Sequence, residues 1–183
     1  MEIKTKNLML VPLGVKYLSS THKYVSDIEN TRYMVYMPKK DIEETKGFLR
    51  VVDYEWQKRE PSFFEFAILL NDVHIGSVSV YFDKEKTGEV GWIIDKDYWG
   101  KGYATEAAGA LIKHFHTAYG IDHFIAHCDS ENIASQRVMA KLNFSFVEEY
   151  SGRKNRASDE ERIEKKFELR CNYKISYLQI SKS

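Results

Sequence analysis

The sequence predicts an α+β protein in which a twisted, mixed β-sheet of about seven strands is flanked by about four helices. Three strand-like segments follow one another across short turns within residues 63–95, an order typical of an antiparallel meander. A strand, a long amphipathic helix and another strand succeed each other within residues 89–128, and this order usually makes two strands parallel. The combination of the two patterns is what makes the predicted sheet mixed.

The first third of the chain contains one predicted strand and two predicted helices. Leu8–Gly14 reads as a short strand, and Val15–Asp27 carries apolar residues along one helical side. After a polar turn, Asp41–Glu60 again has apolar residues near helical spacing. Its first turn is rich in acids, which suits the dipole of a helix that begins there.

A hairpin and a third strand form the predicted meander. Phe63–Leu70 and Val73–Phe82 are rich in β-branched and aromatic residues, and the turn Asn71-Asp72 separates them. Glu89–Asp95 then extends the meander by one strand.

The strongest helical pattern follows Gly102 and ends at Gly120, a residue type common at helix C-termini. Apolar residues recur there at intervals of three and four positions, so they share one face of the predicted helix. They are Ala104, Ala107, Ala108, Leu111, Ile112, Phe115 and Ala118.

The last third of the chain alternates between strand and helix patterns. His123–Cys128 reads as a strand, and Asn132–Phe144 as a helix with Asn132 at its N-cap. Residues 144–154 and Arg162–Arg170 read as two final strands around a charged loop.

Composition excludes several classes of protein. Among 183 residues, 27 basic side chains balance 27 acidic ones, which argues against a nucleic-acid-binding or anionic-membrane-binding surface. The two cysteines are far apart, so we expect no metal site and no disulfide framework. The charged N-terminus and the lack of a run of roughly 18 apolar residues predict a cytoplasmic protein with no membrane partner.

No repeat, low-complexity tract or linker divides the chain, so we expect a single domain over residues 1–183. The segment 171–183 stands apart as a C-terminal tail. It would add an edge strand, mediate dimer contacts or be loose, and both a monomer and a homodimer stay open.

Gly100 and Gly102 lie between a predicted strand and a predicted helix. The first N–H groups of a helix have no partners within it, and glycines let a ligand approach the main chain. Together with the helix dipole, this favours a phosphate or pyrophosphate. A Walker A loop is excluded because Gly102 follows Lys101 directly, and the dinucleotide fingerprint is excluded because Thr105 stands at the third glycine's place. The alternative is a turn with no ligand.

Two motifs in order resemble one known family. The unit WGKGYA, Trp99–Ala104, resembles the acyl-CoA loop Arg/Gln-x-x-Gly-x-Gly/Ala of the GNAT superfamily of N-acetyltransferases. The longer string GWIIDKDYWGKGYATEA is similar to the branch that contains the ribosomal-protein N-terminal acetyltransferases of the RimJ/RimL type. NIASQRVMAKLNF, Asn132–Phe144, resembles the second signature helix of that branch.

The resemblance implies a GNAT-type fold, acetyl-CoA as the cofactor and a set of residues that bind it. The strand before the loop would offer its main chain to the cofactor, the loop would hold the pyrophosphate, and two polar residues of the second motif would contact pantetheine. These residues are Trp92, Ile93 and Ile94, then Trp99, Gly100, Lys101, Gly102, Tyr103, Ala104 and Thr105, and finally Asn132 and Ser135. Trp99 departs from the family pattern, so the main-chain N–H groups would carry the pyrophosphate, with Lys101 as a compensating charge.

The resemblance also implies direct attack of a neutral amine on the thioester within a ternary complex. The bases considered are Glu89, at the start of the strand that leads to the cofactor, and Glu148 or Glu149 on the strand after the second motif. We take Glu89 and Glu149 as the predicted catalytic residues, although each also fits an ordinary surface glutamate. His127 alternates with strand residues and fits a packed side chain.

Many GNAT enzymes carry a tyrosine in the second-motif helix that protonates the departing thiolate, and that position holds Met139 here. A methionine cannot donate a proton. Protonation would then fall to water or to Tyr103, Tyr150 or His127, which the sequence does not rank.

The acceptor is open. A protein N-terminus, a small-molecule amine and a lysine side chain compete, and Tyr33, Tyr36, Trp56 and the last hairpin would line the pocket. The main prediction is an acetyl-CoA-dependent N-acetyltransferase. A non-catalytic acyl-CoA-binding or regulatory module, supported by Met139, and a plain structural domain are the alternatives.

Overall fold

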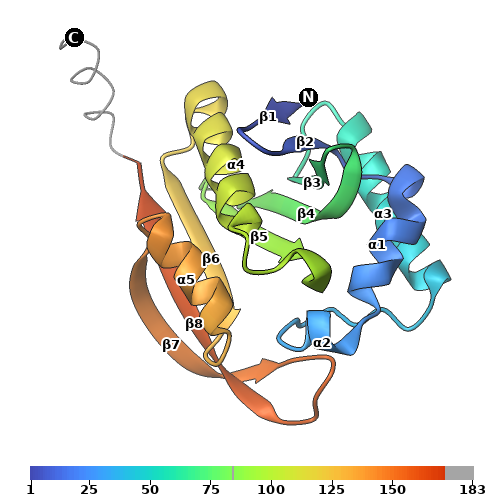
Figure 1. The fold of residues 1–183 in the computed structure, drawn as a ribbon. Helices are drawn as coiled ribbons and strands as arrows, with labels where there is room; N and C mark the ends of the chain where they lie inside the picture. The colour runs from blue at the N-terminus through green and yellow to red at the C-terminus, as the bar shows by residue number, and fades with distance from the viewer. Residues whose placement is uncertain (84, 172–183) are drawn as a thin grey trace, which may run out of the picture.

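A computed structural model describes residues 1–83 and 85–171, and this part of the chain is built on one eight-stranded sheet (Figure 1). The strands lie in the order β1-β2-β3-β4-β5-β6-β8-β7, with β5 and β6 parallel and every other neighbouring pair antiparallel. The strands are β1 (Ile3–Lys4), β2 (Met9–Pro12), β3 (Phe63–Leu70), β4 (Val73–Phe82), β5 (Gly88–Ile94), β6 (His123–Asp129), β7 (Ser145–Lys154) and β8 (Glu161–Arg170). The helices are α1 (Leu18–Val25), α2 (Ile28–Thr31), α3 (Ile42–Gln57), α4 (Tyr103–Tyr119) and α5 (Ile133–Lys141).

The α+β class, the mixed sheet and the parallel pair joined by a long helix are confirmed. The sheet has one strand more than predicted, because the two residues of β1 are too few to produce a periodic pattern. One further helix, α2, occupies part of the predicted polar turn. It begins where the Asp27 side chain accepts a hydrogen bond from the Asn30 N–H at 2.8 Å.

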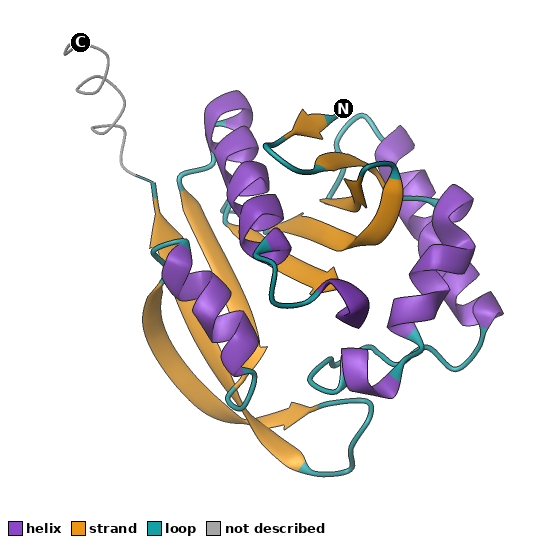
Figure 2. Ribbon diagram, in the orientation of Figure 1, coloured by secondary structure: helices purple, strands orange, loops and turns teal. Residues whose placement is uncertain are grey.

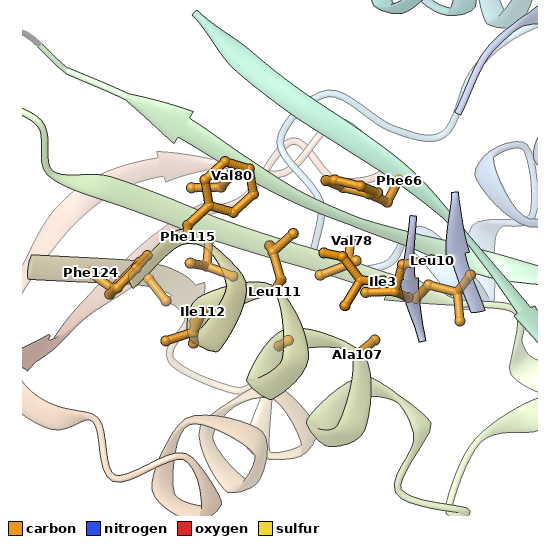
Figure 3. Packing of buried hydrophobic residues seen from close by; sticks show 14 of the residues in the cluster. Ile3, Leu10, Phe66, Val78, Val80, Ala107, Leu111, Ile112, Phe115 and Phe124 are labelled. Atoms are coloured by element: carbon orange, nitrogen blue, oxygen red, sulfur yellow. The ribbon is translucent and has the colours of Figure 1, made fainter. Parts of the chain in front are cut away.

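Helix α4 covers one face of the sheet and supplies the centre of the largest core. Leu111 and Phe115 are fully buried and face Phe66, Val78 and Val80 from β3 and β4 (Figure 3). Each such side chain contributes roughly 1.5–3 kcal/mol by burial. Helix α5 packs beside α4 and against β6, so we call this side the α4/α5 face.

Helices α1 and α3 cover the opposite face, the α1/α3 face. Leu49 and Val52 of α3 pack against Ala67, the neighbour of Phe66 on β3. Tyr24 of α1 packs against Ile93 of β5. The change of face between adjacent strand residues is the alternation expected for a sheet covered on both sides.

Strands β5 and β6 run together only at their beginnings. Gly88 pairs with Phe124 and Glu89 with Ile125, and after these two pairs the strands separate (Figure 2). The later residues of β5 remain paired with β4 on their other side. The sheet is therefore open at its middle, at the ends of β5 and β6.

A second connection joins the two sides of this opening. The end of β7 and the loop after it reach the segment after α2, where Arg153 Nη2 of β7 donates to the Tyr33 carbonyl at 2.7 Å. The Arg156 N–H donates to the Met34 carbonyl at 3.0 Å, and the Arg156 guanidinium pairs with Glu44 of α3. The loop thus bridges β8 to the helices of the α1/α3 face.

Two predictions about the whole chain remain. Within residues 1–83 and 85–171, no helix has both the length and the apolar character needed to cross a bilayer. The predicted tail lies outside the described residues from position 172 onward, and the single-domain organisation stays a prediction.

Candidate functional site

A cavity of ≈ 550 Å³ lies where β5 and β6 separate, beside the beginnings of α4 and α5. All of the predicted cofactor-binding residues line this cavity except Lys101. The lining residues come from four segments: Glu29, Asn30, Arg32, Tyr33 and Met34; Trp92, Ile93 and Ile94; Tyr98, Trp99, Gly100, Gly102, Tyr103, Ala104 and Thr105; and Asn132, Ala134, Ser135, Arg137, Val138 and Lys141.

The N-terminus of α4 presents open main chain to the cavity. Gly102 is the N-cap, with φ at 84° and no side-chain cap, and Gly100 has φ at 75°. A Cβ added at either glycine would meet no atom within 4 Å, so the space above the main chain is free. The N–H groups of the first helical turn have no partner within the helix, which suits a phosphate or pyrophosphate. These residues therefore fit a pyrophosphate-bearing ligand.

Trp99 and Lys101 add little charge to this anion site. The Trp99 indole N–H donates to the Ile94 carbonyl at 2.7 Å, so it anchors the loop to the end of β5. Lys101 Nζ lies 3.5 Å from the Asp97 carbonyl oxygen and 5.3 Å from the centroid of the Tyr98 ring. Lys101 is the predicted cofactor residue that does not line the cavity.

Two residues of β5 point their main-chain groups to the opening. The Ile94 carbonyl accepts from Asn30 Nδ2 at 3.1 Å as well as from Trp99, so it points away from β4. Because main-chain groups alternate along a strand, those of Trp92 point the same way, and those of Ile93 point toward β4. Trp92 and Ile94 therefore both point to the open side of β5, and because the Ile94 carbonyl is already engaged by Asn30 and Trp99, the main chain of Trp92 is the part left for a ligand.

Asn132 caps α5 and also lines the cavity. Its Oδ1 accepts from the Ser135 N–H at 3.0 Å, so the capping interpretation of this side chain holds. Ser135 lines the cavity from the same turn. Both residues thus line the cavity, and the Asn132 side chain is already engaged by its own helix.

Arg137 and Lys141 are two cationic residues of the site that the sequence analysis missed. They lie four positions apart on α5, line the cavity and have no ion-pair partner within the described part of the chain. Unpaired cations beside an uncapped helix N-terminus favour a polyanionic ligand. The signal was present in the motif NIASQRVMAKLNF, because positions i and i+4 share one helical face.

Ion pairs fix the turn between β5 and α4 against the first helices. Lys23 of α1 lies 2.7 Å from Asp95 and 2.6 Å from Asp97, and these partners raise the pKa of the Lys23 amine above its usual range. Lys96 pairs with Asp27 at 2.7 Å and Glu29 at 2.9 Å, on α2 and its cap. The turn that carries the glycine loop is thereby held in place by charges from two helices.

On the other face of the sheet, Glu89 and His127 come together. Glu89 Oε1 lies 2.9 Å from His127 Nδ1, across the point where β5 and β6 separate. Their strand neighbours Val90 and Ala126 belong to the core under α4, so Glu89 and His127 point to the α1/α3 face. The sequence proposed both residues but not their contact.

The two other glutamates considered point to opposite sides. Glu148 lies 3.6 Å from Lys166, which is the register partner of His127, so Glu148 shares the face of the Glu89–His127 pair. Glu149 pairs in register with Lys165, the neighbour of the buried Cys128. The structure does not bring Glu149 to Glu89, because adjacent strand residues face opposite sides.

The candidate proton donors are separated by the fold. Met139 is fully buried in the core and is not among the residues that line the cavity. Burial and a hydrogen bond with Glu164 raise the pKa of Tyr150 to about 12. Tyr103, the first residue of α4, lines the cavity.

The three residues predicted to line an acceptor pocket lie in different parts of the structure. Tyr33 lines the cavity and its carbonyl receives Arg153. Tyr36 is 78% exposed in the following segment. Trp56 packs edge-on against Phe66, with ring centroids 5.0 Å apart, and its indole N–H donates to the Glu65 carbonyl. Trp56 therefore belongs to the core.

Comparisons with known proteins point to one family. The sequence profile described as "Acetyltransferase (GNAT) domain" matches residues 7–145. The uncharacterized N-acetyltransferase YnaD of Bacillus subtilis (strain 168) is 31% identical over 147 residues, which cover 78% of this chain and 81% of that protein.

Solved structures share the fold over almost the whole chain. An acetyltransferase of the GNAT family from Bacillus anthracis superposes with a TM-score of 0.79 at 25% identity, covering 93% of this chain and 98% of the other. RimL, a ribosomal L7/L12 alpha-N-protein acetyltransferase in complex with coenzyme A, superposes with a TM-score of 0.84 at 16% identity and the same coverage, 93% and 98%. At that identity the second likeness is one of fold.

Proposed function

The chain belongs to the GNAT family of acetyltransferases and is an acetyl-CoA-dependent N-acetyltransferase; from that premise we propose that its acceptor is the amine of a protein N-terminus, which reaches the thioester from the α1/α3 face. The observation that carries the proposal is the separation of β5 from β6. Glu89 belongs to the last register pair of these two strands and contacts His127, and the cavity beside α4 and α5 begins three residues later on β5, at Trp92.

Acetyl-CoA, when bound, supplies a thioester whose carbonyl carbon a neutral amine can attack, with the thiolate as leaving group. The first N–H groups of α4 would bind the pyrophosphate, and Arg137 and Lys141 would add positive charge. The main chain of Trp92 would pair with the amide groups of pantetheine. These contacts would hold the reacting carbon at the opening of the sheet.

The Glu89–His127 pair would accept the proton that the amine loses on forming the new C–N bond. Its place at the last β5–β6 register pair supports this role. An α-amine with a pKa near ~7.8 is roughly a quarter neutral at about pH 7.4, whereas a lysine near ~10.4 is only about 0.1% neutral. An α-amine therefore needs little more than a hydrogen-bond acceptor in the right place, which this pair would provide.

The thiolate would take its proton on the cavity side of the sheet. Tyr103 lines that cavity, whereas His127 and Tyr150 do not. We therefore rank the Tyr103 hydroxyl, or water bound to it, first for this step.

The fold shared with RimL, whose title describes action on an alpha-amine, supports the choice of a protein N-terminus. A small-molecule amine is the second candidate, because the exposed Glu89 is open to any primary amine that fits. We further propose one catalytic domain that works in the cytoplasm, as a monomer or homodimer.

The experiment is a thiol-release assay with acetyl-CoA against N-terminal peptides, small amines and lysine peptides. Turnover should be highest with a peptide α-amine. Glu89→Gln and His127→Gln should each lower kcat/KM by roughly 10²-fold or more, the usual contribution of general acid–base catalysis.

Glu149→Gln is the matched comparison, since Glu149 was predicted from the sequence and lies on the other face. Its kcat/KM should stay within about twofold of wild type. A loss with Glu149→Gln equal to that with Glu89→Gln would contradict the assignment of the base.

A further inference from the structure

A partly exposed aromatic pair, Phe63 and Tyr81, stands beside the Glu89–His127 pair. Phe63, Tyr81 and Glu89 are register neighbours on β3, β4 and β5, so they form one row across the α1/α3 face. The rings of Phe63 and Tyr81 are stacked, with centroids 4.7 Å apart and planes at 18°. Tyr81 is 40% exposed although it lies toward the middle of the sheet. A flat apolar surface therefore adjoins the carboxylate of Glu89.

A buried carboxyl group fixes the Tyr81 ring. The Tyr81 hydroxyl donates to Glu65 Oε1 at 3.0 Å, and Glu65 is only 7% exposed on β3. Ser79, on the same face of β4, also helps to stabilise the charged form of this carboxyl. A buried carboxyl group is costly without partners, and the acetyl transfer described above gives Glu65 no role. The hydroxyl of Tyr81 is thus committed to the protein, and the outer part of its ring is left for a ligand.

We propose that Tyr81 determines acceptor specificity by offering its ring to an apolar group attached next to the reacting amine, with Glu65 as the positioning residue that holds the ring. This inference rests on the proposed function, since it concerns the acceptor of the same reaction. An amine bound at Glu89 would place its neighbouring substituent over β4, where the ring lies. The acceptor class is then a primary amine that carries an apolar or aromatic side chain on the adjacent carbon.

Protonation of Glu65 should be visible in the binding of such an acceptor. Burial raises the pKa of the Glu65 carboxyl to about 7. Above that pH the hydroxyl of Tyr81 donates to a carboxylate, and below it to a neutral acid, which is the weaker acceptor. The other titratable groups around the pair are Tyr24 on α1, Glu55 with its partner Lys58 on α3, and Glu89 on β5.

The test compares two tetrapeptides that differ only in their first residue, phenylalanine or glycine, as acceptors with saturating acetyl-CoA. For the small-molecule class the matched pair is 2-phenylethylamine and ethylamine. The enzyme variants are Tyr81→Ala, Tyr81→Phe and Glu65→Gln, with Tyr54→Ala as the control, because Tyr54 is an exposed tyrosine of α3 and not a member of this row. KM for each acceptor, KM for acetyl-CoA and the midpoint of thermal unfolding are measured for each protein.

Wild type and Tyr54→Ala should have a KM for the aromatic acceptor roughly tenfold below that for the small one, and Tyr81→Ala should lose this ratio. KM for acetyl-CoA should stay constant throughout. Tyr81→Phe should reduce the ratio in part. In wild type the ratio of the two KM values should decline below about pH 7, where Glu65 is protonated. Glu65→Gln keeps an acceptor oxygen for Tyr81, so it should retain the ratio and show no such decline. A purely structural role of Glu65 would not produce this result.

The possible outcomes distinguish a failure of this inference from a failure of the proposed function. Turnover by wild type with equal KM for both acceptors, or an unchanged ratio in folded Tyr81→Ala, overturns the inference and leaves acetyl transfer standing. No turnover with any amine would overturn the proposed function and this inference together. A pH profile of Glu65→Gln identical to wild type would remove Glu65 from the proposal.

Discussion

Gly102 and Gly120 cap the two ends of α4 with similar backbone angles, φ of 84° and 69°, and both have free space where a Cβ would stand. Replacing either by leucine should therefore cost about the same stability, roughly 1–2 kcal/mol for a left-handed residue. Only Gly102→Leu should also weaken coenzyme A binding, by more than about tenfold, because its side chain would fill the anion site.

Isothermal titration with coenzyme A and thermal unfolding of both variants check this expectation. Gly120→Leu is the control for backbone strain, since it lies at the far end of the same helix. Equal affinities in the two variants would mean that the N-terminus of α4 does not bind the pyrophosphate.

At the scale of elements, α5 adds the positive charges of Arg137 and Lys141 to the cavity beside the N-terminus of α4. Arg137→Gln and Lys141→Gln should each weaken coenzyme A binding about three- to tenfold at low ionic strength, and less at high salt, because exposed charges are screened over roughly 10 Å at 0.1 M salt. Binding measured between 20 and about 500 mM salt tests this, with Lys113→Gln on the exposed side of α4 as the control. An effect independent of salt would argue that these side chains only pack.

Element order could be predicted from the sequence, but the facing of single residues could not. The apolar repeat through Leu111 and Phe115 fixed α4, and the order of strand, helix and strand gave the parallel pair. Glu148 and Glu149 were indistinguishable because β7 contains an irregularity between Phe146 and Glu148, which shifts the alternation. No local pattern announces such a bulge.

The candidate site, too, could be predicted from the sequence only in part. The glycine loop and the second motif are continuous in sequence, so the residues around Gly102 and Asn132 could be named beforehand. The contact between Tyr81 and Glu65 joins two strands through a hydrogen bond, and a glutamate within an apolar strand is readily taken for a surface residue. Burial and side-chain pairing across strands depend on tertiary structure, so no local sequence pattern predicts them.

At the scale of the whole molecule, the buried Glu65 should make stability depend on pH. Its carboxyl pKa rises from 4.5 to about 7 on folding, so the folded state holds a proton that the unfolded chain releases. The resulting stabilisation is present below about pH 4.5 and is lost as the pH rises through about 7, on the order of 3 kcal/mol in total. Glu65→Gln should not undergo this loss.

Urea unfolding of wild type and Glu65→Gln at pH 5 and pH 8 measures the difference. The free energy of unfolding of Glu65→Gln, relative to that of wild type, should be larger at pH 8 than at pH 5. Glu149→Gln, which replaces an exposed glutamate, should follow wild type at both pH values. Parallel pH profiles for all three proteins would show that Glu65 titrates normally.

The opening between β5 and β6 also has a mechanical meaning. Two register pairs and the bridge from Arg153 and Arg156 join a sheet whose outer parts, β1–β5 and β6–β8, are each continuously paired. Acetyl-CoA bound at the edge of β5 beside Trp92 and in contact with α5 would supply contacts between these two parts that the polypeptide itself does not make. Binding and release of the cofactor in each turnover cycle would then alternately stiffen and loosen the connection between the two parts.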